Sequence, residues 1–142
     1  MAVELVHLVA TAFMAGVIAF VQFVHYPLMA YVGAPGYADY QSRHATLTSG
    51  VVGIPMAAEA LAAVWLMATR VEGRQVAIVG VGLLVMIWAS TALLQVPAHT
   101  ALGRGFDTQA HRRLVATNWI RTIAWVARIP LAVSLVISAG TS

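Results

Sequence analysis

Four of the five histidines stand at the ends of apolar segments, where their side chains could act together. Imidazole titrates near neutral pH, transfers protons, and is a common ligand of zinc, copper and iron. No two of the four have the close helical spacing of a known metalloenzyme motif, so a shared site requires ligands from separate segments. Three interpretations stay open: a transition-metal site or, less favoured, haem held by two histidines; acid–base or hydrogen-bonding histidines; and ordinary polar residues at a membrane surface. The four are His25, His44, His99 and His111.

Three charged residues lie inside apolar segments. A charge at bilayer depth costs several kcal/mol even on lenient scales, so such a residue usually faces a partner or a cavity. By depth, Glu59 is expected near Arg128 and within reach of Arg121. A structural ion pair is one interpretation, and a role for Glu59 as proton acceptor or ligand is the other. Because one carboxylate cannot neutralise two guanidinium groups, the surplus positive charge could hold an anionic or enolate-like group.

The composition is that of an integral membrane protein. Of the 142 residues, 61% are hydrophobic and 9% are charged, whereas soluble domains carry about 25% charged residues. The absence of cysteine excludes thiol catalysis, disulfides and cysteine metal sites. All cationic residues are scattered arginines, so nucleic acid is not an expected partner despite the formal net charge of +3.

Four apolar stretches are long enough to cross a bilayer, which takes about 20 helical residues. Backbone polar groups cannot stay unpaired in lipid, so these stretches are expected to be helices. The chain is thus predicted to be an all-α, multi-pass protein, a four-transmembrane-helix bundle forming one domain over residues 1–142. The expected spans are residues 3–29, 51–69, 76–96 and 114–139.

The links between the spans differ in kind. The first contains Gly-Ala-Pro-Gly and then an amphipathic piece, which predicts a short interfacial helix over residues 37–48. The second, residues 70–75, suits a tight turn. Four spans place both termini on one side and the two long links on the other. Four arginines flank the long links and two flank the other side, so the positive-inside rule favours the long links as cytoplasmic.

Within the first, third and fourth spans, polar residues follow helical spacing. With about 100° per residue, those of the first span fall within an arc of about 80°. Such stripes also serve as hydrogen-bonding contacts between membrane helices, which is the structural alternative. Stripes packed inward predict a polar interior that opens toward the long links. They consist of Glu4, His7, Thr11, Gln22 and His25 in the first span, Trp88, Thr91, Gln95 and His99 in the third, and His111, Asn118, Thr122 and Trp125 in the fourth.

Four short segments resemble the anthrone oxygenase-like family of small four-helix integral membrane proteins. They are "VHYPLM" at the end of the first span, "GIPMAAEAL" in the second, "QVPAH" at the end of the third and "NWIRT" in the fourth. The likeness covers most of the chain in order and spacing, through short motifs. The family has asparagines at the positions of Gln95 and His99, and this departure favours a histidine-rich, metal-dependent variant.

The resemblance implies oxidation of a lipophilic polycyclic phenol to a quinone by dioxygen. A base would deprotonate the substrate, and cationic or amide groups would hold the resulting oxyanion. Matched to the family pattern, Asn118, Arg121 and Gln95 would contact the substrate or the oxyanion. His99 is then the nearest candidate base.

Residues and resemblance together lead to one hypothesis and two rivals. The first is a membrane-embedded, oxygenase-like oxidoreductase acting on a lipophilic aromatic or quinone-like molecule near the long links. The rivals are a non-catalytic binding protein or small transporter for a metal ion, haem or lipophile, and a structural subunit of a membrane complex. A homo-oligomer is compatible with all three. The predicted catalytic residues are His99, Glu59 and Arg121, the predicted substrate-binding residues are Gln95, Asn118, Trp88, Trp125, Gln22 and Arg128, and a copper, iron or zinc ion would be held by His25, His44, His99 and His111.

Overall fold

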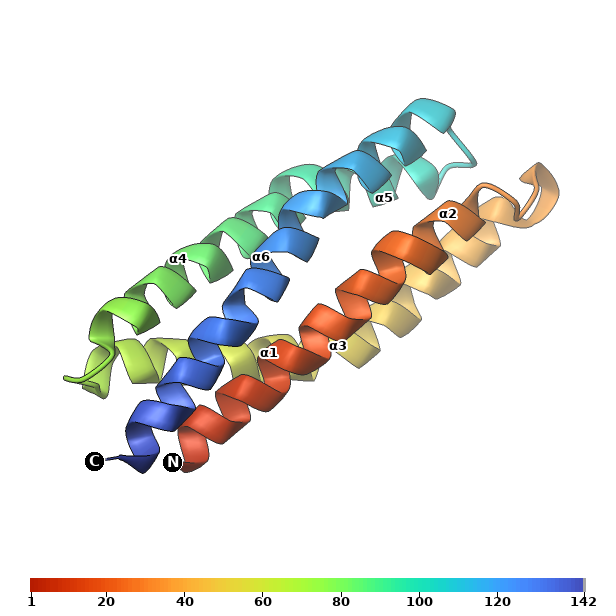
Figure 1. Ribbon diagram of the computed structural model, residues 1–142. Helices are drawn as coiled ribbons and strands as arrows, with labels where there is room; N and C mark the ends of the chain where they lie inside the picture. The colour runs from red at the N-terminus through yellow and green to blue at the C-terminus, as the bar shows by residue number, and fades with distance from the viewer. Residues whose placement is uncertain (142) are drawn as a thin grey trace.

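The computed structural model describes residues 1–141 as a bundle of four long helical rods (Figure 1). Within these residues, four helical segments are long and apolar enough to cross a membrane, as expected of a multi-pass membrane protein. The predicted all-α bundle of four long helices is therefore confirmed. The segments are Ala2–Met29, Ala34–Thr69, Arg74–Leu102 and Thr108–Gly140.

Two of the rods are composite, because a π-helical turn separates two α-helices in each. The other two rods are single long helices, one of them preceded by a short 3-10 turn. In chain order the elements are α1 (Ala2–Phe20), η1 (Val21–His25), α2 (Tyr26–Met29), η2 (Ala34–Gly36), α3 (Tyr37–Thr69), α4 (Arg74–Ser90), η3 (Thr91–Gln95), α5 (Val96–Leu102) and α6 (Thr108–Gly140).

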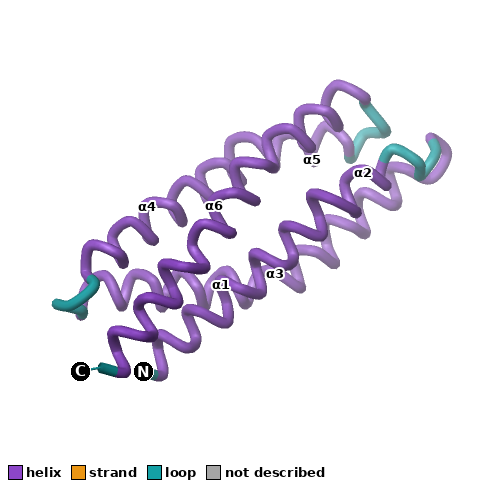
Figure 2. Tube along the Cα trace, viewed as in Figure 1, coloured by secondary structure: helices purple, strands orange, loops and turns teal. Residues whose placement is uncertain are grey.

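The four rods form a ring in which each packs against two neighbours. α1 packs on α3 and α6, and α4 packs on the same two helices. Both chain termini lie at one end, beside the turn between α3 and α4 (Figure 1). The two longer links, from α2 to α3 and from α5 to α6, meet at the opposite end, where Figure 2 shows them in teal. We call this the long-link end; it is the arrangement that four spans predict.

The prediction of a short interfacial helix over residues 37–48 is wrong. Those residues are the first turns of α3, which runs without a break from Tyr37 to Thr69. Gly50 and Gly53 follow the amphipathic piece, but a glycine inside a helix costs only about 1 kcal/mol relative to alanine. Ending the helix there would expose backbone groups to lipid at greater cost. The second span therefore extends toward the long-link end, and Pro55 lies inside it.

The two π-helical turns occur just before prolines. η1 precedes Pro27, and η3 precedes Pro97. A proline has no N–H to donate, and its ring collides with the carbonyl four residues earlier. The backbone hydrogen bonds there span five residues in place of four, which makes a π turn, a form that is frequent at functional sites. Because a π turn rotates the following side chains about the helix axis, the turns set the directions of Tyr26 and His99.

A helix cap at the long-link end and a glycine at the opposite end define two of the turns between the rods. Asp107 caps α6, since its carboxylate accepts the Ala110 N–H at 2.6 Å. Gly73 precedes α4 with a φ of 72°, a left-handed conformation that favours glycine. A Cβ there would lie 3.2 Å from Leu135 Cδ2, so the turn also packs closely. The tight turn predicted for residues 70–75 is thus confirmed.

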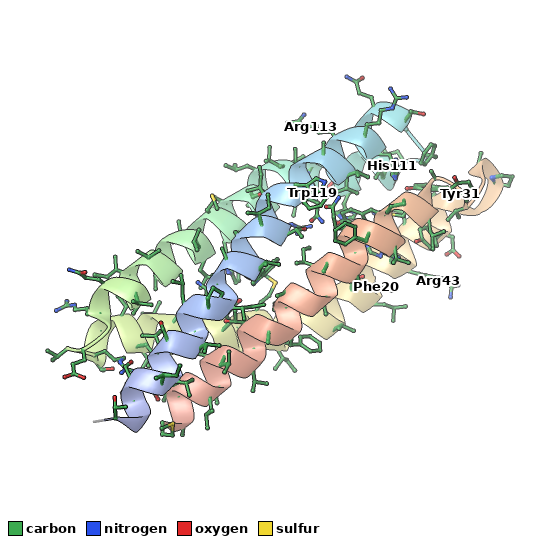
Figure 3. All side chains as sticks on the ribbon, in the orientation of Figure 1. Phe20, Tyr31, Arg43, His111, Arg113 and Trp119 are labelled. Atoms are coloured by element: carbon green, nitrogen blue, oxygen red, sulfur yellow. The ribbon has the colours of Figure 1, made fainter. Side chains whose placement is uncertain are left out.

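The interior of the bundle is polar as well as apolar. Large apolar side chains such as Phe20 and Trp119 lie on the outside (Figure 3), as expected of helices that face lipid. Most members of the predicted polar stripes are buried, but Trp88 is 47% exposed. The buried polar side chains are Glu4, His7, Thr11, Gln22, Gln41, Glu59, Ser90, Gln95, Asn118, Thr122 and Arg128.

Candidate functional site

A cavity of about 570 Å³, here called the inner cavity, lies in the half of the bundle nearest the long-link end. This volume is within the range of about 300–1,000 Å³ that is typical of small-molecule sites. Much of the wall is apolar, with Met14, Ile18, Val52 and Met56 among the lining residues. The main polar groups come from separate rods and are Tyr26, Gln41, His44, Thr91, Gln95, His99 and Arg121.

Tyr26 and His99 share a hydrogen bond at the wall of the inner cavity. The Tyr26 hydroxyl lies 3.0 Å from His99 Nε2, and Tyr26 is only 2% exposed. The other ring nitrogen, His99 Nδ1, lies 2.7 Å from the side-chain amide of Gln41. An amide can present either its N–H or its carbonyl at such a contact. The His99 ring is thus held from both sides, and it can exchange a proton with Tyr26.

Two more histidines adjoin this pair. His25 Nε2 lies 2.8 Å from His44 Nδ1, and the two rings are stacked with centroids 4.5 Å apart. The His44 ring centroid lies 5.3 Å from that of His99. Thr48 Oγ1 is 3.1 Å from His44 Nδ1, one turn along α3. Three of the four predicted histidines therefore gather at one place, from three different rods.

Arg121 brings a positive charge to the inner cavity. It donates to the Tyr26 hydroxyl at 3.2 Å, to Thr91 Oγ1 at 3.4 Å and to Asn118 Oδ1 at 2.9 Å. All three acceptors are neutral, and no carboxylate within residues 1–141 forms an ion pair with Arg121. A partly buried cation without an anionic partner favours the binding of an anion or of an oxygen that becomes one.

Buried amides hold Arg121 in position. Asn118 Nδ2 donates to Gln22 Oε1 at 2.8 Å, and Gln22 donates to the Val115 carbonyl at 3.3 Å. Asn118 and Gln22 lie behind Arg121 and are not among the residues that line the inner cavity. Gln95 does line it, although its amide is already bonded to two hydroxyl groups. The predicted amides are therefore near the site, and two of them support Arg121.

Glu59 pairs with Arg128 and not with Arg121. Glu59 Oε1 lies 3.0 Å from Arg128 Nε, and both side chains are completely buried. The carboxylate also accepts from Thr11 at 2.9 Å and from the Trp125 indole at 3.0 Å. Arg128 donates further to His7 Nε2 at 3.1 Å. This arrangement is that of an ion pair inside the bundle. Glu59 does not line the inner cavity, although its hydrogen-bond partner Trp125 does.

Two other predicted residues lie apart from the inner cavity. Trp88 belongs to the exposed surface of α4 and is not a lining residue. His111 Nε2 lies 2.8 Å from the carbonyl oxygen of Tyr26, so His111 satisfies a backbone group near the end of the first rod. The helical register places Trp88 in the polar stripe, but its large apolar ring is compatible with lipid.

His25, His44 and His99, here called the histidine group, do not have the geometry of an assembled metal site. Among the residues that the structure describes, no three His, Asp or Glu side chains are arranged to hold an ion. Two nitrogens on one tetrahedral zinc, each bound at about 2.05 Å, lie roughly 3.3 Å apart. His25 Nε2 and His44 Nδ1 lie 2.8 Å apart, a distance that suits a hydrogen bond. A metal held here would require the rings to turn.

Sequence reasoning did not select Tyr26 or Gln41 as site residues. Tyr26 lies in the "VHYPLM" segment, and the irregular helix that Pro27 imposes was the available signal. Gln41 falls in residues 37–48, which were expected to lie outside the bundle. Its role becomes visible only because α3 continues through this segment into the bundle.

Comparison of the chain with protein-family models, curated proteins and solved structures finds no match.

Proposed function

We propose that the protein is a membrane-embedded oxidoreductase that binds a lipophilic phenol, anthrone or hydroquinone in the inner cavity and oxidises it with dioxygen. The acidic oxygen of the substrate would lie beside Arg121 and Tyr26, and its rings would fill the apolar part of the cavity. The proposal joins the geometry of the inner cavity to the family resemblance of the sequence.

The position of Arg121 carries the proposal. Its guanidinium lines a largely apolar cavity, next to the Tyr26–His99 pair, without a carboxylate partner in residues 1–141. Such surroundings favour a ligand that is apolar over most of its surface and becomes anionic at one oxygen. Enolates and phenolates of aromatic molecules have this character, and a fixed cation stabilises the charge as it develops. The size of the cavity argues against a purely structural subunit.

The first proposed step is a proton transfer. The enol or phenol O–H of the substrate donates to the Tyr26 oxygen, and the Tyr26 proton passes to His99 Nε2 over the observed 3.0 Å. The ring becomes an imidazolium, whose Nδ1–H donates to the Gln41 carbonyl when the amide presents that end. The substrate is left as an oxyanion beside Arg121. His99 thus acts as the general base, with Tyr26 as the relay.

Dioxygen is the proposed oxidant. For an anthrone, the carbanionic ring carbon of the enolate forms a bond to one oxygen atom of dioxygen, which is reduced to the peroxide level. The peroxide anion takes back the proton from His99. The hydrogen on that carbon then leaves as a proton while the O–O bond breaks, and the departing hydroxide takes up this proton as water, which leaves a carbonyl at that carbon. Anthrone and dioxygen give the quinone and water, so atoms and electrons balance.

Oxygen consumption by the purified protein, with anthrone and a hydroquinone as probes, tests the proposal. Replacing Arg121 by Gln is expected to lower kcat about 10²–10³-fold, as for the loss of one oxyanion donor. Arg113→Gln is the matched control, because Arg113 is an exposed arginine on the same helix (Figure 3). Wild-type protein that oxidises neither probe, or an Arg121→Gln variant with unchanged turnover, would contradict the proposal.

The histidine group supports a second candidate, a non-catalytic site for a metal ion or a lipophile. Three imidazoles from separate rods already lie close together, and His44 and His99 line the inner cavity. Elemental analysis and absorption spectra would distinguish the candidates. Stoichiometric copper, iron or zinc that is lost in His44→Ala, without oxygen consumption, would favour a metal-binding protein. A bound lipophile without turnover would favour a carrier.

A further inference from the structure

A second hollow of about 610 Å³ lies between α1 and α3, and we call it the α1–α3 groove. From α1 it is lined by Ala12, Phe13, Gly16 and Phe20, among others. A Cβ added at Gly16 would meet nothing within 4 Å, so the missing side chain leaves open space along this face. Ala12 and Gly16, one turn apart on α1, fill little of this space, so the groove stays open beside them.

The rim of the α1–α3 groove is made of side chains that face the lipid side of the bundle. Phe13 and Phe20 on α1, and Leu47 and Val51 on α3, are all exposed large apolar residues. The inner cavity has a different rim, between α3 and α5, where Ser42, Ser49 and Thr100 line it and are exposed. The first half of α3 therefore has a polar opening on one side and an apolar opening on the other.

The α1–α3 groove and the inner cavity share part of their walls. The polar groups in the groove lining are the two stacked histidines, His25 and His44, and Thr48. His44 faces both spaces, beside His99 of the proposed reaction site. The groove therefore reaches from the lipid-facing surface to His44, which also lines the inner cavity, and to His25, which does not. The shared lining residues are Val17, Val21, His44, Thr48 and Val52.

We propose that the α1–α3 groove binds a hydrocarbon chain carried by the substrate, while the acidic ring of the same molecule occupies the inner cavity. The inference rests on the proposed function, because it requires an acidic ring beside Arg121. To occupy both spaces, the molecule would pass between α1 and α3 at the lining residues that the two spaces share, and the apolar rim would leave the far end of its chain in lipid. The substrate class is thereby narrowed to phenols, anthrones or hydroquinones that bear an alkyl or isoprenoid chain.

Photoaffinity labelling tests the position of the chain without requiring turnover. The probe is a phenol with a long alkyl chain and a diazirine midway along the chain, used on the wild-type protein in lipid nanodiscs. Mass spectrometry is expected to locate the label on the groove residues of α1 and α3, such as Phe13 or Leu47. An excess of a phenol without a chain should compete with this labelling, because the two share the inner cavity.

The outcomes separate the two proposals. Label at Ser42, Ser49 or Thr100, with competition, would place the chain in the α3–α5 opening and overturn the inference while leaving the proposed function intact. Label in the α1–α3 groove without competition would mean that the groove holds any lipid chain, which also overturns the inference. A phenol that fails to compete and is not oxidised would count against the proposed function itself.

A variant gives an independent measurement. Gly16→Leu places a side chain in the open space of the groove. The preference for the long-chain over the chainless phenol, measured as the ratio of their Kd values, is expected to fall about tenfold, in line with the cost of overpacking. Gly82→Leu is the matched control, since Gly82 is exposed on α4 and its Cβ would also meet nothing within 4 Å. An unchanged ratio in Gly16→Leu would overturn the proposal.

Discussion

Arg121 and Tyr26 are 95 residues apart in the chain, yet the guanidinium of Arg121 donates to the Tyr26 hydroxyl at 3.2 Å. The same hydroxyl is 3.0 Å from His99 Nε2. The Tyr26 oxygen thus lies between a fixed cation and a group that can take a proton. This relationship joins the first, third and fourth rods at the wall of the inner cavity.

Tyr26→Phe isolates the role of that oxygen. The variant keeps the aromatic ring in its buried position and removes only the hydroxyl. Because the proton relay to His99 would be lost, kcat for anthrone oxidation is expected to fall about 10²-fold, within the usual range for general acid–base groups. Oxygen consumption measures the effect, and circular dichroism confirms the helical content. Turnover equal to that of the wild type would show that Tyr26 relays no proton.

Gln41→Leu tests whether the amide positions the His99 ring. The replacement is similar in size and buried, but it leaves His99 Nδ1 without its partner at 2.7 Å. We expect kcat to fall about tenfold with little change in KM, the pattern of an interaction that matters mainly in the transition state. Gln41→Glu, which can still accept from Nδ1, should recover part of the loss. A rise in KM with kcat unchanged would instead assign Gln41 to substrate binding.

The Glu59–Arg128 pair is expected to control stability. Removing one partner leaves a buried charge unpaired, and such losses are about 3–5 kcal/mol. Glu59→Leu and Arg128→Met should therefore each lower the free energy of unfolding in detergent by roughly that amount. The double variant should lose much less than the sum of the two, because neither charge remains. Additive losses in this double-mutant cycle would mean that the two side chains act independently.

Pro27→Ala tests the link between the π turn and the site. An alanine restores the missing N–H, so the backbone hydrogen bonds can return to α-helical spacing. Tyr26 would then rotate about the helix axis, away from His99. We expect stability to be kept or raised, and turnover to fall about tenfold or more, as when a strained functional conformation is relaxed. Thermal unfolding and oxygen consumption are the two measurements. Pro130→Ala is the control, because Pro130 lies on α6 beyond Trp125, the last residue of this helix that lines the inner cavity.

The sequence predicted the bundle, the shared end of the long links and much of the buried polar interior. Helical spacing was sufficient for Thr11 and Asn118, because both lie in regular α-helix. The depth of the two residues along their predicted spans correctly placed Glu59 beside Arg128. Each of these predictions depends on local periodicity or on distance along a rod, which the chain itself determines.

The composition of the site could not be predicted in the same way. The inward direction of Tyr26, which follows η1, depends on the π turn, which the 3.6-residue period does not include. Trp88 shows the limit of periodicity, since it fits the polar stripe but lies at the surface. The sequence predicted a surplus positive charge, but the place of that charge, on Arg121 beside Tyr26 and the inner cavity, depends on packing among the rods and appeared only in three dimensions.

The surroundings of α3 differ along its length. Its second half is anchored by Glu59, whose carboxylate bonds to side chains on α1 and α6. Its first half has open volume on both flanks and carries Gln41 and His44. Because Gln41 contacts the imidazole of His99 and His44 lies beside it, a change in the position of this half of α3 would also change how the imidazole is held.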